Sequence, residues 1–146
     1  MSYYFNKTIT DTFDHAIERV TKELAGEGFG IITQIDIASA FKNKIGMDFR
    51  PYRILGACNP KLAHEALQLE DKVGTMLPCN VIVQETAPGQ VEIAAIDPVA
   101  SMAAIDNPEL VKKAALIRDR LKGVIERLQP ERAVGAICAK RPDGSS

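Results

Sequence analysis

Two of the three cysteines occupy positions at which a thiol could do chemistry. Cys58 and Cys79 each precede an asparagine, Asn59 and Asn80, and each lies at an expected strand–loop boundary, where a scaffold can present reactive groups. Cys58 also lies just ahead of an expected helix N-terminus, whose positive dipole end favours a thiolate. One interpretation is therefore a thiol or metal site shared by Cys58 and Cys79. Thiolate ligands would favour zinc or copper(I) at such a site.

The alternative interpretation is that both cysteines pack as small apolar side chains, because free cysteine is among the most buried residue types. The spacing of Cys58 and Cys79 matches no zinc-finger or CxxC pattern. The third cysteine, Cys138, lies in a weakly patterned C-terminal segment and is interpreted as incidental. The residues alone leave both interpretations open.

Histidine offers little support for a metal site. His64 falls nearly opposite the apolar side of its expected helix, which Leu62 and Leu67 help to define, so we expect it to be exposed. To join Cys58 in a metal site, its ring would need a partner lying over that outer face. His15, beside Asp14, is interpreted as a surface residue.

Charged residues near strand ends are weaker candidates. Asp36, Glu85 and Asp97 follow expected strands and could line a pocket, although loop carboxylates are usually solvated and Asp97-Pro98 is typical of a turn. Arg53, beside Tyr52 on an expected strand, could bind an anion through its fork of donors. A strand arginine more often faces water or a nearby carboxylate.

The chain contains none of the GxGxxG, P-loop, GxSxG or HExxH signatures, so no motif assigns an enzyme class or a cofactor. The formal charge of −1 gives no field that would attract nucleic acid. The N-terminus lacks the features of a signal peptide, and no apolar run approaches the roughly 20 residues that span a bilayer. We therefore expect a cytoplasmic protein with reduced cysteines and no membrane or nucleic-acid partner.

Residue patterning predicts an α+β fold with a mainly antiparallel five-stranded sheet in the order β-α-β-(α)-β-(α)-β-β-α. Strands are expected over residues 3–9, 29–37, 52–58, 80–85 and 90–96, with a hairpin turn at 87–89. Helices are expected after a cap at Thr10 or Asp11, over 38–45, over 59–70 and from Asn107 to about residue 128. We expect residues 1–130 to form a single domain and residues 131–146 a weakly structured tail.

Several expected strands are apolar on both faces. The main stripe of the second strand contains Phe29, Ile31, Thr33, Ile35 and Ile37, and the residues expected opposite the main stripes are Ile32, Leu55, Ile82 and Ile96. The two long helices can cover only one face of the sheet. Inserted helices or a second copy of the chain must then cover the other face, and we expect a homodimer.

The segment Gly46-Met47-Asp48-Phe49-Arg50-Pro51-Tyr52-Arg53-Ile54-Leu55-Gly56-Ala57-Cys58-Asn59-Pro60 resembles the prokaryotic domain-of-unknown-function family 302. Further motifs extend the resemblance over roughly residues 3–128: Gly28-Phe29-Gly30, Ile35-Asp36, Leu62-Ala63-His64, Leu77-Pro78-Cys79-Asn80-Val81 and Ile96-Asp97-Pro98. It implies a single copy of a TATA-binding-protein-like β-α-β4-α fold with added helices, which forms dimers. The matched positions include Cys58, Asn59, Pro60, His64, Cys79, Asn80 and Asp97, but the family implies no established activity.

The leading functional hypothesis is a small homodimeric binding module that holds a small ligand or a soft metal ion near Cys58 and Cys79. A second hypothesis is a thiol-dependent redox enzyme, in which one of these cysteines is the nucleophile and the other resolves it. The third is a protein-interaction domain with merely structural cysteines.

Overall fold

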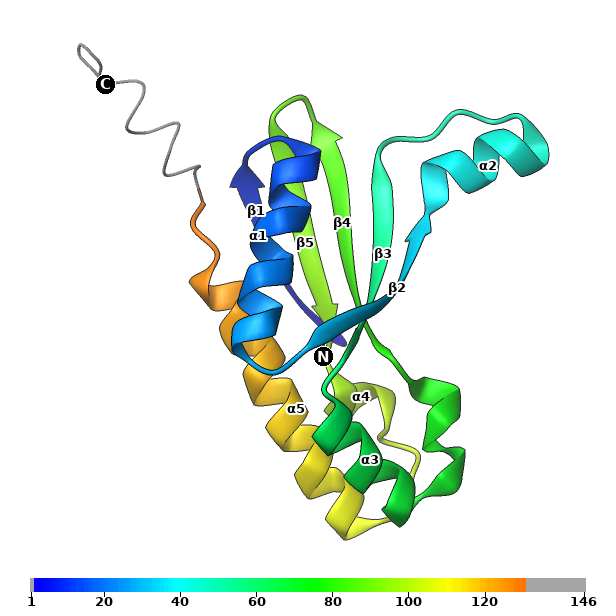
Figure 1. Ribbon diagram of the computed structural model, residues 1–146, viewed down its shortest axis with the longest axis vertical. Helices are drawn as coiled ribbons and strands as arrows, with labels where there is room; N and C mark the ends of the chain where they lie inside the picture. The colour runs from blue at the N-terminus through cyan, green and yellow to red at the C-terminus, as the bar shows by residue number, and fades with distance from the viewer. Residues whose placement is uncertain (1, 131–146) are drawn as a thin grey trace.

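The computed structural model describes residues 2–130, and the tail predicted for residues 131–146, with Cys138, lies outside them. Their secondary-structure elements follow the predicted order (Figure 1): β1 (Tyr4–Thr10), α1 (Phe13–Gly26), β2 (Gly30–Asp36), α2 (Ile37–Ile45), β3 (Tyr52–Cys58), α3 (Pro60–Leu69), the 3-10 helix η1 (Asp71–Met76), β4 (Cys79–Ala87), β5 (Gln90–Ile96), α4 (Pro98–Ser101) and α5 (Pro108–Arg127). The five strands form one sheet in the order β1-β5-β4-β3-β2, and every neighbouring pair is antiparallel. The predicted fold class is confirmed.

Short polar side chains begin the α-helices. Each accepts a hydrogen bond from a backbone N–H of the first turn that has no partner within the helix. The capping residues are Thr12, Asp36, Asn59, Asp97 and Asn107. Three of these helices also carry proline at the first helical position, where no donor is needed, so an Asx–Pro pair marks each of their starts.

The predicted cap of the first helix was wrong. Thr12, rather than Thr10 or Asp11, caps α1 by accepting a hydrogen bond from the His15 N–H at 3.2 Å. Thr10 still belongs to β1. Asp11 is buried and accepts a hydrogen bond from the Thr12 N–H at 2.7 Å, so its carboxylate holds the strand–helix junction instead.

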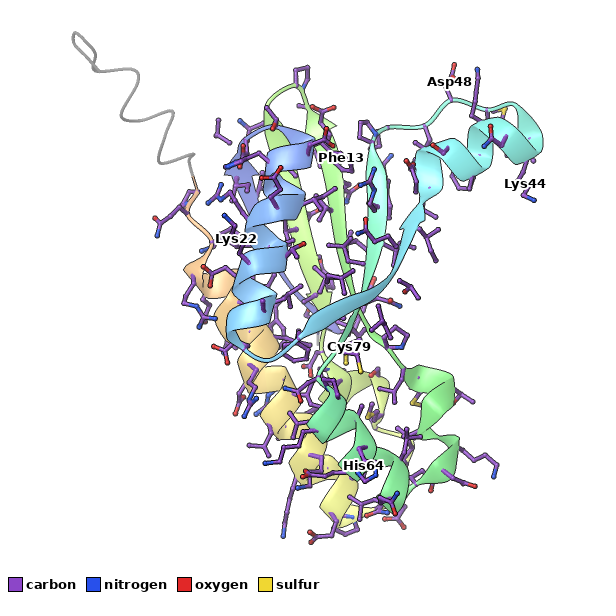
Figure 2. The ribbon with its side chains drawn as sticks, viewed as in Figure 1. Phe13, Lys22, Lys44, Asp48, His64 and Cys79 are labelled. Carbon is purple, nitrogen blue, oxygen red and sulfur yellow. The ribbon has the colours of Figure 1, made fainter. Side chains whose placement is uncertain are left out.

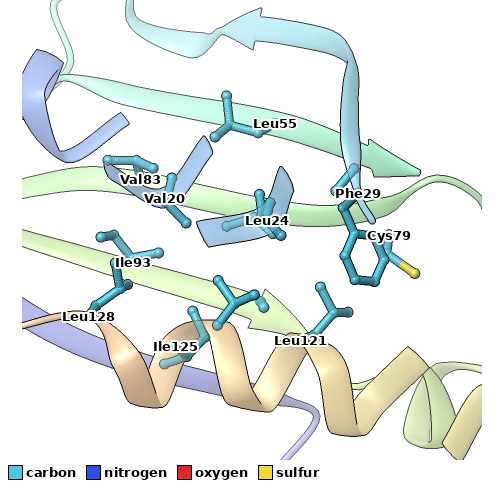
Figure 3. Packing of buried hydrophobic residues seen from close by; sticks show 14 of the residues in the cluster. Val20, Leu24, Phe29, Leu55, Cys79, Val83, Ile93, Leu121, Ile125 and Leu128 are labelled. Atoms are coloured by element: carbon cyan, nitrogen blue, oxygen red, sulfur yellow. The ribbon is translucent and has the colours of Figure 1, made fainter. Parts of the chain in front are cut away.

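Helices α1 and α5 lie against one face of the sheet and form the main core with it (Figure 1). The helix side of this core includes Val20 and Leu24, four residues apart on α1, and Leu121 of α5. They pack on strand residues such as Val83 and Ile93 (Figure 3). All five side chains are fully buried. The other face of the sheet receives neither helix.

A bulge in β2 changes which residues face the helices. The pairing of β2 with β3 shifts between Ile31 and Thr33, so Ile31 lies on the helix side while Ile35 lies on the open side. Ile32 is left in the bulge and is 60% exposed. The single stripe predicted for this strand was therefore wrong. Leu55 was also misplaced, because it is fully buried beneath the helices and its neighbour Ile54 faces the open side.

A second, smaller core lies at the end of the sheet where α3, η1 and α4 gather around the first half of α5 (Figure 1). Its buried residues are Ala66, Val73, Met102, Leu110 and Ala114. The cap residue Asn107 also donates a hydrogen bond from Nδ2 to the Leu69 carbonyl at 3.1 Å, which joins α5 to α3. Neither η1 nor α4 was predicted, since each is too short to show helical periodicity.

Helix α2 projects from the sheet together with the loop that leads into β3 (Figure 1). None of its residues is buried. It is held by aromatic contacts, with the Phe41 and Phe49 ring centroids 5.1 Å apart and those of Phe49 and Tyr52 6.1 Å apart. Among residues 2–130, therefore, no inserted helix covers the open face of the sheet.

Within the same residues no helix is both long and apolar enough to cross a membrane.

Candidate functional site

The strand register brings the two predicted cysteines to neighbouring positions. Strands β3 and β4 pair with Ala57 opposite Cys79, so Cys58 lies one residue beyond the partner of Cys79. Cys79 faces the helices, where it packs beside Phe29 and Leu121 in the main core (Figure 3). Cys58 is half-buried at the end of β3, and both thiols are free.

Burial decides the chemistry open to Cys79. Its side chain is 5% exposed, and desolvation, followed by the nearby Cys58 thiol, raises its pKa from 9.0 to about 11. Cys79 is therefore a protonated thiol near neutral pH, which makes it a poor nucleophile and a poor metal ligand. In the described part of the chain, no group of three histidine, cysteine or acidic residues is placed to hold a metal ion.

Asn59 has a structural role next to Cys58. Its Oδ1 accepts a hydrogen bond from the Leu62 N–H at 3.2 Å, and its Nδ2 donates to the Glu27 carbonyl at 3.3 Å. The backbone of Gly28 passes close above it with φ of +85°, and a Cβ there would lie 2.8 Å from Asn59 Nδ2. Asn59 thus ties the start of α3 to the end of α1.

The other predicted residues lie on different elements. His64 is exposed on the outer side of α3, as predicted (Figure 2). Asp97 caps α4 through its Oδ1, which accepts from the Val99 N–H at 3.0 Å. Arg53 pairs with Asp36 at 3.5 Å on the helix side of β3. Of these residues, Asp97 alone lies at the strand ends that carry the cysteines, because the pairing of Val81 with Ala95 leads to Cys79 and Asp97 at the ends of β4 and β5, and its carboxylate is engaged in the cap of α4.

The open face of the sheet carries a continuous apolar row. Ile35, Ile54, Ile82 and Ala94 are direct cross-strand neighbours on four adjacent strands. Ile35 is 48% exposed, and the other three are half-buried although no helix covers them. A solvated face of an antiparallel sheet normally alternates to polar residues, so this row marks a surface suited to a partner or a ligand.

A groove of about 380 Å³ lies on this open face, over strands β1, β5 and β4. Its apolar lining comes from Ile82, Ala94 and Ile96. Asn80 lines the groove as well. Within the part of the chain described, no other residue of the predicted site does. The groove therefore begins beside the strand end that carries Cys79, but on the opposite face of β4.

Three tyrosines, Tyr3, Tyr4 and Tyr52, form the aromatic part of the groove. The Tyr3 and Tyr4 rings meet edge to face, with their centroids 5.0 Å apart. Tyr3 is 64% exposed and Tyr4 39%, so much of their ring surface is available for contact. Tyrosine combines a large apolar surface with a polar hydroxyl, which suits it to binding sites.

Hydrogen bonds connect two polar residues of the groove lining, Glu92 and Gln84, to Asn6 and Arg50 outside it. Glu92 accepts hydrogen bonds from Asn6 Nδ2 and from Gln84 Nε2, each at 2.8 Å. Gln84 Oε1 in turn accepts from Arg50 Nε at 2.8 Å. The Arg50 guanidinium lies 4.4 Å from the Phe49 ring centroid. These residues are far apart in sequence, and only the strand register places them side by side.

A buried ionic cluster at the start of α1 also escaped the sequence analysis. The Asp11 carboxylate, which is fully buried, accepts hydrogen bonds from His15 Nδ1 at 2.8 Å and Arg19 Nη1 at 2.9 Å. Burial raises the pKa of Asp11, but the hydrogen bonds from Arg19, His15 and the Thr12 N–H outweigh it, and the pKa is lowered overall. The His15 side chain is 35% exposed, so it lies at the surface as predicted, but its contact with Asp11 was not predicted.

The four-residue spacing of Asp11, His15 and Arg19 was the available signal, because it places successive side chains on one helix face. Arg19 Nη2 also donates to the Gln129 carbonyl at 2.9 Å. The cluster therefore joins α1 to the chain just after α5, which is a structural role.

The family model for the domain of unknown function DUF302 matches residues 5–128. The chain belongs to the DUF302 family. A crystal structure of an uncharacterized conserved DUF302 protein from Bacillus stearothermophilus is similar to it, with a TM-score of 0.81 and 29% sequence identity over 88% of this chain and 100% of the other. No curated protein matches the chain. DUF302 membership establishes the fold and carries no activity with it, so function has to be argued from the groove and the side chains around it.

Proposed function

We propose that this protein is a small homodimeric binding module that holds a small ligand in the groove on the open face of its sheet. The groove itself carries the proposal. Its volume of about 380 Å³ falls within the range of small-molecule sites, and an apolar floor with a few polar groups is their usual composition. The predicted site is thereby moved from the cysteines to the face on which Asn80 lies.

The second copy is proposed from the apolar row. Ile35 and Ile54 lie on β2 and β3, beside the groove but outside its lining. Covering them requires another surface, and a symmetric pair of identical faces is the commonest way in which soluble proteins supply one. Two sheets packed face to face would leave the grooves enclosed between the copies.

The redox hypothesis receives less support. Whether as nucleophile or as resolving residue, Cys79 would have to attack as a thiolate, and the pKa of about 11 keeps the Cys79 thiol protonated near neutral pH. The burial of Cys79 in the core instead agrees with a packing role for that residue.

The ligand part is tested by native mass spectrometry of freshly purified protein. We expect excess mass over the denatured chain, and we expect Ala94→Phe to abolish it because the added ring would fill the groove. Ala104→Phe, at an exposed position outside the groove, is the matched control and should retain the mass. An unchanged excess mass in Ala94→Phe would place the ligand elsewhere.

Sedimentation velocity at tens of micromolar protein tests the homodimer. We expect a dimer that Ile35→Lys converts into a monomer, whereas Leu116→Lys leaves it intact. The two positions are matched, since Ile35 on the sheet and Leu116 on α5 are both 48% exposed. A monomeric wild-type protein would refute the dimer and leave the ligand part to the mass measurement.

A further inference from the structure

Glu92 is unusual among the residues that line the groove. It is half-buried, and both of its carboxylate oxygens accept hydrogen bonds from neutral amides, those of Asn6 and Gln84. Across residues 2–130, no lysine, arginine or histidine forms an ion pair with it. Because both of its hydrogen-bond partners are neutral, a positive charge brought by a ligand would meet no competing ion pair at Glu92 among these residues.

The surroundings of Glu92 show where that charge could come from. Among the described lining residues, Glu92 alone is charged, so the groove as a whole is negative. Arg50 is the cation at the end of the hydrogen-bond chain, but Gln84 stands between it and Glu92, and Arg50 does not line the groove. The open side of Glu92 faces the groove, where a ligand can approach.

The tyrosines add a second preference for positive charge. Tyr3 and Tyr4 present aromatic rings around the same groove, and ring faces attract ammonium groups through their quadrupoles. Tyr52 also lines the groove, but the Arg50 guanidinium already lies 5.8 Å from its ring centroid. Aromatic rings beside a carboxylate are a combination that recognises alkylammonium groups. The apolar side chains of Ile82, Ala94 and Ile96 would contact an uncharged body attached to such a group.

We infer that the ligand of the groove is an organic ammonium cation with an apolar body, whose charged head lies against Glu92 and the tyrosine rings. The inference rests on the proposed ligand-binding function and specifies its chemical class. Among residues 2–130 no lysine or arginine lines the groove, and Arg50, which donates to Gln84 and lies 5.8 Å from the Tyr52 ring centroid, stays outside the lining.

Three small probes of similar size test the charge preference: phenethylamine, which is cationic at neutral pH, neutral 2-phenylethanol and anionic phenylacetate. Each is titrated into the full-length ¹⁵N-labelled protein while amide shifts of strands β1, β4 and β5 are followed. We expect phenethylamine to bind at least about fivefold more tightly than 2-phenylethanol, with phenylacetate the weakest. Glu92→Gln should reduce the cation preference to about twofold or less, because it keeps the shape of the side chain and removes its charge.

Glu85→Gln, which removes a carboxylate from β4 outside the groove, is the matched control and should leave the preference unchanged. Tyr4→Leu provides a second variant that keeps apolar bulk: it should weaken phenethylamine binding more than 2-phenylethanol binding. Equal affinity for all three probes, tighter binding of phenylacetate, or a preference that survives Glu92→Gln would overturn the ammonium assignment while the groove remains a ligand site. Absence of groove shifts with all three probes would overturn the proposed function as well.

Discussion

Replacing Cys79 by alanine should flatten the loss of stability that the protein shows at alkaline pH. Burial raises the pKa of Cys79 from 9.0 to about 11, so the folded chain keeps this proton at pH values at which the unfolded chain has released it. A raised pKa adds stability that is fully present below the unfolded pKa and is lost as pH rises through the folded one. Between about pH 8 and about pH 10 the loss is on the order of 1 kcal/mol.

Urea denaturation followed by circular dichroism at about pH 8 and about pH 10 measures this loss. The quantity of interest is the pH-dependent change in unfolding free energy of the wild type minus that of Cys79→Ala, because lysine and tyrosine titration is common to both and cancels. Cys79→Ala should also cost about 1 kcal/mol at the lower pH through lost packing. Cys58→Ala is the control: it keeps the buried thiol, so it should retain most of the alkaline loss, reduced by the lesser contribution of Cys58 to the raised pKa of Cys79. If wild type and Cys79→Ala lose the same stability between the two pH values, burial does not hold this proton and the assignment of Cys79 to the core is wrong.

Three further substitutions test contacts that hold the site in place. Asn59→Ala should lower the unfolding free energy by about 2 kcal/mol, because a helix cap and a buried tertiary hydrogen bond are lost together, whereas exposed Lys61→Ala should change it little in the same urea titration. Gly56→Ala should cost about 1–3 kcal/mol, because the new Cβ would overlap Thr33 Oγ1, and combining it with Thr33→Ala should recover part of that loss. Asp11→Asn should remove a stabilisation that the wild type has above the unfolded carboxyl pKa of 3.8 and loses as pH falls below it, so thermal midpoints of the two proteins should converge in acid.

Local chemistry explains which parts of the fold the sequence could predict. Strands β3 and β5 have the predicted bounds. An Asx–Pro pair follows each of these strands, and a Pro–Gly turn precedes β5, so local signals fix three of their four ends. The start of α5 was predicted from Asn107-Pro108 for the same reason. Such signals act within a few residues, so a single sequence contains them in full.

The candidate site could not be predicted in the same way, because it depends on register between distant strands. The bulge at Ile32 places Ile35 on the open face, and no residue type in that strand predicts a bulge. Glu92, Gln84 and Asn6 come from three strands and meet only through the pairing of β4 and β1 with β5. Residues such as Asn59 and Asp97 attracted attention for their chemistry, yet their side chains cap helices.

Helix α2 can unfold locally while the rest of the molecule stays folded. It has nine residues and none of them is buried, and an isolated helix of that length is marginal in water. Its backbone amides should therefore exchange with solvent through local opening, at a free energy far below that of the sheet amides beneath α1 and α5. A partner that binds to the exposed Ile45 and Met47 would have to order α2 in doing so. Its binding would therefore slow amide exchange in α2.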